Sequence, residues 1–304
     1  MNRDAGPGSA RARKKQLGIT LTLLGVICFS SKGIFAKLAY AYGVDPITLM
    51  TLRMAIAMPL FLILLVCLAP APGPWTYNDL RRVVLAGLVG YYVAQLLDLY
   101  ALQTVSATLG RLILFTYPCF VVLMTAILNR RLPTMYATMP LLLSYVGLSV
   151  AVLGGGTDDL RATWLGVGLM VLSAILFASY YVVAGGLSAR FGTLRFSAVI
   201  MTAAGVATMT HFIVTRPVTE LFLQPGPVYV YAGALAIGVT VLPLLLIVEG
   251  LRHVGTETSA TLNLTGPLFT FLLAWPILGE QLALLQWVGF VLVLGGGWLL
   301  SRRR

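Results

Sequence analysis

The sequence predicts an all-α integral membrane protein with about ten transmembrane helices. Of its 304 residues, 59% are hydrophobic and 10% are charged, whereas soluble domains have about a quarter charged residues. The charges are also segregated along the chain. Long uncharged stretches cover residues 132–157, 162–189, 221–248, 258–279 and 281–301. A helix needs about 20 apolar residues to cross the hydrocarbon core, and backbone groups in lipid must pair within the structure.

The uncharged stretches and the polar breaks between them define ten expected spans. The apolar run of the first is too long for a typical signal peptide, and no small-residue cleavage site closes it. We therefore expect an uncleaved first helix after a basic tail (residues 1–16), and two helical units over residues 17–156 and 163–301. The expected spans cover residues 17–35, 46–68, 83–101, 107–128, 133–153, 164–184, 194–214, 228–248, 258–278 and 282–300.

The basic residues are distributed unevenly between the two ends of these spans. When the ends are assigned alternately to two sides, one side collects 15 of the 21 Lys and Arg residues and the other only three. Cytoplasmic loops carry such an excess, so both termini are expected to be cytoplasmic, in a plasma (inner) membrane. The same bias explains the net charge of +11. It favours contact with anionic membrane lipids over a nucleic-acid partner.

The two halves of the chain share an ordered set of matches. Residues 105–118 and 254–267 each begin with valine and end with proline. Further along, Gly147 in Tyr-Val-Gly matches Gly289 in Trp-Val-Gly, and both halves end in three consecutive glycines. Each match is weak alone, because apolar helices resemble one another, but their common order indicates an internal repeat.

A repeat of five helices has consequences for topology and function. Since five is odd, the second half must enter the membrane from the opposite side. Inverted repeats of this kind occur in secondary transporters, where the substrate site lies between the halves near the midplane. Pro118 and Pro267 are then candidate paired helix breaks. The alternative is that they reflect only the general frequency of proline in membrane helices.

Three features carry a resemblance to a known family. They are residues 267–282, which run from Pro to Leu-Gly-Glu-Gln-Leu, residues 101–107 leading to Pro118, and Arg53 in the second span. On these features the chain resembles EamA-type members of the drug/metabolite transporter (DMT) superfamily, over residues 17–300. The resemblance implies ten helices in two five-helix repeats, and export or exchange of a small metabolite across the inner membrane. It does not imply one substrate.

The first half departs from this family pattern. Where members often have Gly-Glu after the fourth span, this chain has Asn129-Arg130-Arg131. Any role of Glu280, which completes the Gly-Glu pair of the second half, is therefore local to that half.

Several kinds of chemistry find no support in the sequence. It contains no Gly-x-x-x-x-Gly-Lys-Ser/Thr loop for ATP, no Cys/His spacing for a metal, and no cofactor motif. We therefore expect a secondary transporter, not an enzyme, with neither metal nor cofactor. A membrane enzyme acting on lipid-linked substrates would need a clustered nucleophile or acid pair. A non-transporting receptor or assembly subunit remains open, as does the oligomeric state.

Four ionisable residues lie inside expected spans: Lys32, Arg53, Asp98 and Arg111. Such residues are costly in lipid and usually face a bundle interior. Counted from the outer ends of their spans, they lie roughly 5–11 Å deep, so they can meet. One acid neutralises one base, which leaves two cations suited to a carboxylate or phosphate. We expect these four and Tyr117 to bind a substrate that is anionic or amino-acid-like. In the alternative, Lys32 and Asp98 snorkel to headgroups and Arg53 only ties helices together.

Two further acids are candidates for coupling to protons. Glu249 and Glu257 flank the expected inner ends of the eighth and ninth spans. An acid partly withdrawn from water can have a raised pKa and carry a proton. The competing interpretation is an ion pair with Arg252 at the headgroup level.

Overall fold

The computed structural model describes residues 7–67, 75–130, 135–154 and 160–301. Within these residues the chain is almost entirely helical and contains no strand. Seven helical stretches are long and apolar enough to cross a membrane. Three shorter apolar helices, Leu142–Leu153, Gly266–Leu278 and Leu284–Leu299, complete a set of ten candidate spans. The predicted all-α membrane fold is confirmed.

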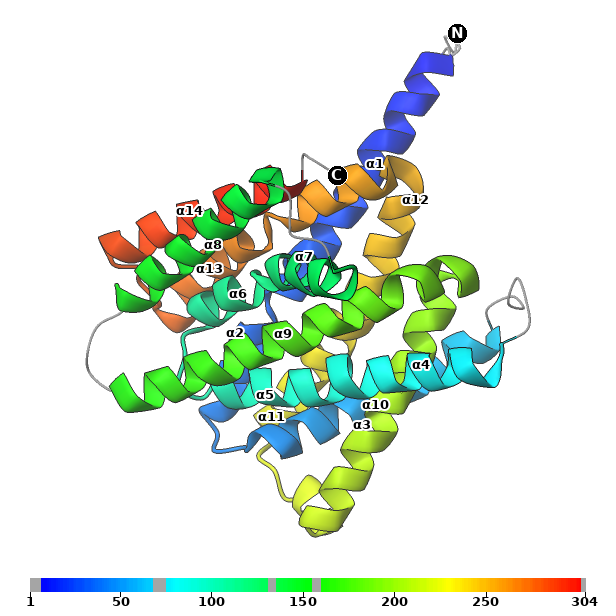
Figure 1. Cartoon of the computed structure of the whole chain (residues 1–304). Helices are drawn as coiled ribbons and strands as arrows, with labels where there is room; N and C mark the ends of the chain where they lie inside the picture. The colour runs from blue at the N-terminus through cyan, green and yellow to red at the C-terminus, as the bar shows by residue number, and fades with distance from the viewer. Residues whose placement is uncertain (1–6, 68–74, 131–134, 155–159, 302–304) are drawn as a thin grey trace, which may run out of the picture.

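The first half of the chain forms five spans, three of which are built from more than one segment. The first span comprises α1 (Pro7–Ser30) and α2 (Lys32–Tyr40), and the second is α3 (Pro46–Cys67). The third comprises α4 (Tyr77–Gly87), the π-helical segment η1 (Leu88–Val93) and α5 (Ala94–Ala101). The fourth comprises α6 (Ala107–Leu114) and α7 (Tyr117–Leu128), and the fifth is α8 (Met135–Leu153), as Figure 1 shows.

The second half repeats this organisation. Its first two spans are α9 (Leu160–Phe191) and α10 (Thr193–Thr215), followed by the 3₁₀ turn η2 (Val218–Leu221). The eighth span comprises α11 (Gly226–Gly233), the π-helical η3 (Ala234–Val241) and the first part of α12 (Leu242–Asn263). Gly255 inside α12 has a φ of 79° and ends this span. The last two spans are α13 (Gly266–Leu278) and α14 (Leu284–Ser301).

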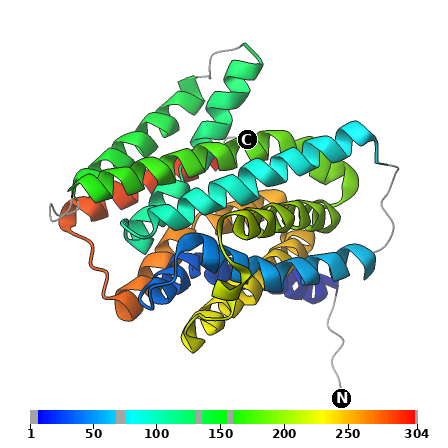
Figure 2. The same ribbon diagram turned by 90° about the horizontal axis from the view of Figure 1, so that it is seen from below.

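The main packing pairs join one half to the other. α1 packs on α12 and α5 packs on α9, which are the first and eighth spans and the third and sixth. α3 packs on α10, and α8 packs on α14. Figures 1 and 2 both show α9 running beside α4 and α5. Exchanging the halves leaves this set of pairs unchanged, as expected for two related five-helix repeats.

The α8–α14 pair depends on the glycines that match between the halves. A Cβ atom added to Gly289 would lie 2.4 Å from the carbonyl oxygen of Gly147 and 2.5 Å from the backbone nitrogen of Ala151. A Cβ atom on Gly147 would lie 2.6 Å from Cβ of Leu292. Small residues allow such close backbone approach between membrane helices. The two matched glycines therefore meet at the contact between the repeats.

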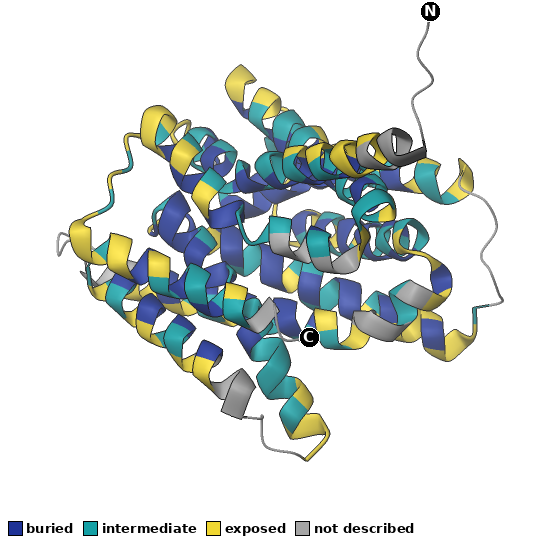
Figure 3. Cartoon of the chain, turned by 90° about the horizontal axis from the view of Figure 1, so that it is seen from above, coloured by how far each residue is buried: buried dark blue, intermediate teal, exposed yellow. Residues whose placement is uncertain are grey.

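Burial follows the pattern expected of a membrane bundle. Figure 3 shows buried residues on the helix faces that point into the bundle and exposed residues on the outer faces. Many large apolar side chains are exposed, among them Ile63, Val66, Leu165 and Val291. Apolar side chains on the outer surface suit contact with lipid, whose tails are as apolar as leucine.

Three expected boundaries are corrected by the structure. The eighth span ends at Gly255 and not at residue 248, because the helix continues without interruption to that glycine. The first span does not end at residue 35, because the chain resumes a helix after Ser31 and continues to Tyr40. Lys32 therefore lies eight residues from the end of that span, about 12 Å at 1.5 Å per residue, and not three residues from it. The third span begins at Tyr77 instead of residue 83, because Thr76 and Asp79 form a capping box that starts the helix earlier.

Candidate functional site

Four ionisable side chains from four different spans approach one another inside the bundle. Lys32, Arg53 and Asp98 are only 4%, 2% and 4% exposed, and Arg111 is partly buried. The Asp98 carboxylate lies within electrostatic range of all three cations. Because the formal sum is two positive charges, the cluster retains a positive field where ionisable groups are costly.

Asp98, the acid of this cluster, forms an ion pair with Lys32. The Lys32 ammonium donates to the Asp98 carboxylate and, at 2.6 Å, to the side-chain oxygen of Gln95. Lys32 begins α2 directly after the break at Ser31, whereas Gln95 and Asp98 lie one turn apart on α5. Both charged groups are buried and paired with each other, so they do not snorkel to the headgroups.

Arg53 ties the second span to the third and the eighth. Its Nε donates to the Thr240 hydroxyl at 2.9 Å, and its Nη1 donates to the Gln95 side-chain oxygen at 3.4 Å. The Thr240 hydroxyl in turn donates to the backbone oxygen of Leu235 at 2.6 Å, within η3. π-helical turns recur at functional sites in membrane and soluble helices. Here η1 and η3 occupy equivalent spans of the two repeats and flank the charged cluster.

Arg111 differs from the other cations of the cluster. Its guanidinium carbon lies 4.6 Å from the centre of the Phe29 ring, at the distance of a cation–π contact. Its Nε is buried without a hydrogen bond, and within the described part of the chain no acceptor bonds to this side chain. Buried polar groups are normally paired. An unpaired guanidinium inside the bundle is therefore suited to receive an acceptor from a bound molecule.

Aromatic side chains of both repeats gather beside Arg111. The Tyr117 ring stacks on Tyr181 with centroids 4.8 Å apart and meets Phe177 edge-on at 5.4 Å. Tyr91 and Tyr180 add a further edge-on pair at 5.0 Å. Tyr117 belongs to α7, and Tyr181 belongs to α9. Tyr117 and Tyr181 also lie within electrostatic range of the Arg111 guanidinium.

The two candidate breaking prolines occupy equivalent positions. The fourth span is interrupted between α6 and α7, and Pro118 is the second residue of α7. The ninth span is interrupted between α12 and α13, and Pro267 is the second residue of α13. Proline fits the first turn of a helix, where its missing N–H has no partner to lose.

The break of the first span is bonded to the start of α13. The hydroxyl of Thr270 donates to the carbonyl oxygen of Ser30 at 2.9 Å, and the Ser30 hydroxyl donates to the carbonyl oxygen of Gly266 at 3.0 Å. A helix break leaves carbonyl groups without intrahelical donors. The bond from Thr270 satisfies the carbonyl of Ser30 near Lys32, and the two bonds together join the two repeats there.

Of the two candidate coupling acids, Glu249 makes its contacts outside this cluster. The Glu249 carboxylate is 47% exposed and pairs with Arg252 at 3.0 Å and with His253 at 3.3 Å. These contacts match the ion-pair interpretation. Glu257 falls within the helix α12, but its side chain lies outside the described residues. A proton-carrying role for either acid stays a prediction.

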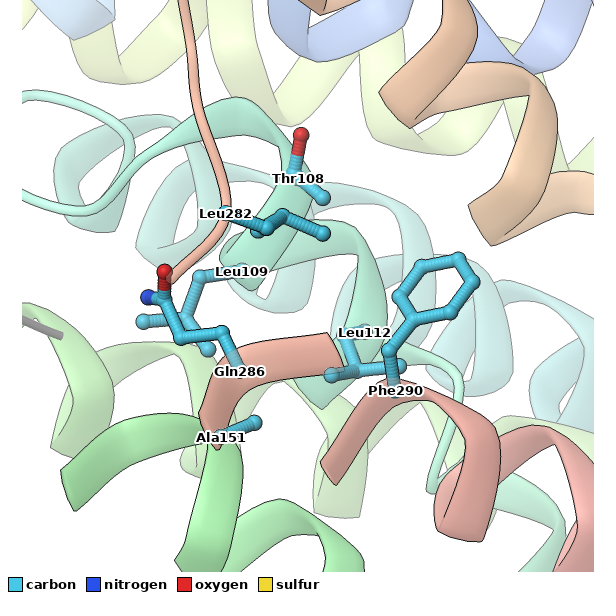
Figure 4. Close-up of a pocket in the computed structure, with 7 residues that line it drawn as sticks. All are labelled: Thr108, Leu109, Leu112, Ala151, Leu282, Gln286 and Phe290. Carbon is cyan, nitrogen blue, oxygen red and sulfur yellow. The ribbon is translucent and has the colours of Figure 1, made fainter. Parts of the chain in front are cut away.

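A small pocket lies between α6, α8 and α14. It has a volume of about 10 Å³, room for about one water molecule. Figure 4 shows its lining: Thr108, Leu109, Leu112, Ala151, Leu282, Gln286 and Phe290. Sites for small molecules usually measure 300–1,000 Å³. This pocket is therefore far too small for an organic substrate.

Sequence reasoning missed the neutral partners of the charged cluster. Gln95 carried a usable signal, because it lies three residues before Asp98 and so shares its helix face. Thr240 carried none, since threonine is frequent in apolar helices. Phe29 could be placed near Arg111 only by the fold.

Comparison with known proteins gives a consistent result. Two segments of the chain, residues 16–153 and 164–302, match the model of the EamA-like transporter family. An uncharacterized transporter of Bacillus subtilis (strain 168) is 32% identical over 284 residues, covering 92% of this chain and 91% of that protein.

More distant relatives also cover most of the chain. A protein of Chlamydia trachomatis serovar L2 named as an S-adenosylmethionine/S-adenosylhomocysteine transporter is 27% identical over 291 residues, covering 91% of this chain and 87% of that one. One crystal structure superposes with a TM-score of 0.64 at 19% identity, covering 94% of this chain and 98% of that one. This last similarity supports the fold alone.

Proposed function

Because the chain belongs to the EamA-like transporter family, we propose that this multi-pass membrane transporter is a secondary transporter for a small organic metabolite with an anionic group. Membership of the family also makes it a transporter and not an enzyme. The substrate binds between the two repeats at Arg53, Arg111, Lys32, Asp98 and Tyr117. The protein resides in the inner membrane with both termini in the cytoplasm, and it exports or exchanges its substrate.

The observation that carries this proposal is the state of Arg111. Lys32 and Arg53 already donate hydrogen bonds to neighbouring side chains, whereas the buried Nε of Arg111 has no hydrogen-bond partner among the described residues and its guanidinium lies over the Phe29 ring. A planar guanidinium binds carboxylate or phosphate in bidentate fashion. We therefore assign the direct contact to Arg111, and assign to Lys32, Asp98 and Arg53 the positive field and the geometry of the site.

The named relatives suggest which metabolites to try first. The chlamydial proteins are named as carriers of S-adenosylmethionine and S-adenosylhomocysteine. Both molecules combine an amino-acid end with a planar adenine ring. In this proposal the carboxylate meets Arg111, and the ring stacks beside Tyr117 and Tyr181, since aromatic rings stack favourably at such distances.

The energy source follows from the absence of an ATP-binding loop in the sequence. Transport is then passive exchange or is driven by an ion gradient, with protons as the first candidate. Glu249 and Glu257 are the candidate proton carriers named from the sequence, and the exposed ion pair of Glu249 makes it the weaker of the two.

The test is uptake by purified protein in sealed vesicles. Vesicles preloaded with a metabolite are offered the labelled form of S-adenosylmethionine, then a panel of amino acids and small organic phosphates. We expect counterflow of at least one of these, with a weakened apparent affinity in Arg111→Gln and an unchanged one in Arg81→Gln, which changes an exposed arginine of α4. Binding without flux would instead identify a receptor, and chemical conversion of the probe would identify an enzyme.

A further inference from the structure

We propose that Glu280 is a positioning residue that holds the outer end of α6, and with it Arg111, in place from the opposite repeat. Its carboxylate accepts hydrogen bonds from the backbone N–H of Ala107 at 2.6 Å and of Thr108 at 3.0 Å. It also accepts one from the Thr108 hydroxyl at 2.7 Å. The inference rests on the proposed function, because it concerns the arginine assigned to the substrate.

The chemistry of this contact is that of a helix cap supplied by a distant segment. The first N–H groups of a helix have no intrahelical acceptor. In α6 the Ser106 hydroxyl accepts from the N–H of Leu109 at 3.1 Å, and Glu280 serves the two preceding groups. A negative charge is stabilised at a helix N-terminus, and bonds to a charged acceptor are about twice as strong as neutral ones. Since Glu280 follows α13, the cap joins the second repeat to the first.

The cap acts directly on the turn that carries Arg111. Thr108 and Arg111 are three residues apart in α6, so they share one face of the helix. In Figure 4 the methyl group of Thr108 faces the pocket residue Leu282, whereas its hydroxyl points away. Ala107 and Thr108 are each 1% exposed, and the hydrogen bonds of Glu280 fix this first turn of α6 to the segment that follows α13.

The contact of Glu280 with α6 lies beside a small apolar cluster of three helices, here called the apolar plug. Ile34 of α2, Ala107 of α6 and Ala274 of α13 are at most 1% exposed and pack together next to it. Lys37 of α2 lies within electrostatic range of the Glu280 carboxylate. In the predicted topology this plug closes the outer side of the bundle, and displacement of α6 would open it.

The cap is confined to one side of the molecule. Gly279 and Arg130 both adopt positive φ, 69° and 50°, twelve residues after Pro267 and Pro118. The next residue is Glu280 in the second repeat and Arg131 in the first. An arginine has no acceptor, so the residue that matches Glu280 in the first repeat cannot form the same cap. Arg131 itself lies outside the described residues.

Thiol labelling tests the proposal without needing a substrate. Cys28, Cys67 and Cys119 are replaced by alanine, Ile34→Cys is introduced, and its reaction with a polar maleimide is timed in lipid nanodiscs, where both faces are accessible. Thr108→Val removes only the hydroxyl bond, and Glu280→Ala removes all three. Glu220→Gln is the matched control, because this acid forms an ion pair with Arg216 in the η2 segment, away from α6.

We expect labelling to be fastest in Glu280→Ala, about tenfold above the parent, as the loss of hydrogen bonds to a charged group implies. The labelling rate of Thr108→Val should lie between those of the parent and Glu280→Ala. Thr108→Ser and Glu220→Gln should be labelled at the rate of the parent. Where counterflow is measurable, KM should rise in the same order while the maximal rate changes less. Equal labelling rates in the parent, Thr108→Val and Glu280→Ala would overturn the proposal. If Glu280→Ala does not fold, the proposal is tested by comparing the labelling rates of Thr108→Val and Thr108→Ser. Absent counterflow with altered labelling would count against the proposed function only.

Discussion

The ammonium of Lys32 and the carboxylate of Asp98 form an ion pair inside the membrane, between the first and third spans. Both side chains are 6% exposed, and Gln95 completes the coordination of the ammonium. A buried pair is stable only when both partners are present, because a single buried charge keeps its desolvation cost without the compensating attraction. The pair is thus a structural requirement of the site as much as part of its field.

Replacing one partner of this pair should destabilise the fold more than replacing both. Asp98→Asn or Lys32→Gln alone should lower the unfolding free energy by about 3–5 kcal/mol, as for other buried pairs. The double variant should recover a large part of that loss, since no unpaired charge remains. Thermal unfolding in detergent, followed with size-exclusion profiles, measures all four proteins. Additive losses in the double variant would show that the two side chains are not coupled.

The glycine contact between the fifth and tenth spans yields a second prediction. Gly289→Ala should lower the unfolding free energy by about 1–3 kcal/mol, because the new methyl meets the backbone of α8 and overpacks the contact. Gly168→Ala is the matched control, since a Cβ atom there meets nothing within 4 Å and alanine favours a helix by roughly 0.5–1 kcal/mol. Similar melting temperatures for both variants would contradict the close packing of α8 on α14.

The fold could be predicted from the sequence in large part, because lipid imposes a simple length and polarity rule. The fourth span, residues 107–128, begins and ends where the charges and polar residues place it. The interruptions were harder to place. The break at Ser31 has no proline beside it, and the hydrogen bonds between Ser30 and α13 that accompany it are supplied only by the folded chain.

The candidate site was predictable in its charged members but not in their roles. Ionisable residues in apolar spans stand out by their cost, which identified Lys32, Arg53, Asp98 and Arg111. Their partners decide which of them is available to a ligand, and those partners are neutral. Gln95 and Thr240 accept hydrogen bonds from Arg53, whereas Nε of Arg111 meets no acceptor among the described residues, and this difference is a property of the packed structure.

Topology gives a third prediction. With both termini in the cytoplasm, Gln103→Cys, in the exposed turn between α5 and α6, should react with an impermeant thiol reagent added to cells with a permeabilised outer layer. Arg82→Cys, exposed on α4, should react only after the inner membrane is opened. Each variant is made without the three native cysteines. Labelling of Arg82→Cys from outside, and of Gln103→Cys only after the inner membrane is opened, would show the opposite orientation.

The exposed ion pair of Glu249 leads to a fourth prediction. Glu249→Gln should retain both uptake and any dependence of uptake on a proton gradient, because the carboxylate is already paired with Arg252 and with His253. Counterflow and gradient-driven uptake are compared with and without an uncoupler. Loss of gradient dependence in this variant, with counterflow intact, would return the proton-carrying role to Glu249.

The most direct test of the central claim is substrate affinity at Arg111. In proteoliposomes, Arg111→Gln should weaken apparent affinity for the transported metabolite about tenfold to a hundredfold, the value of a hydrogen bond to a charged group. Arg111→Lys should fall between, because lysine keeps the charge but loses the planar fork. Arg81→Gln should behave as the parent, and all variants should be monodisperse. Unchanged affinity in a well-folded Arg111→Gln protein would contradict the assignment of the substrate to this arginine.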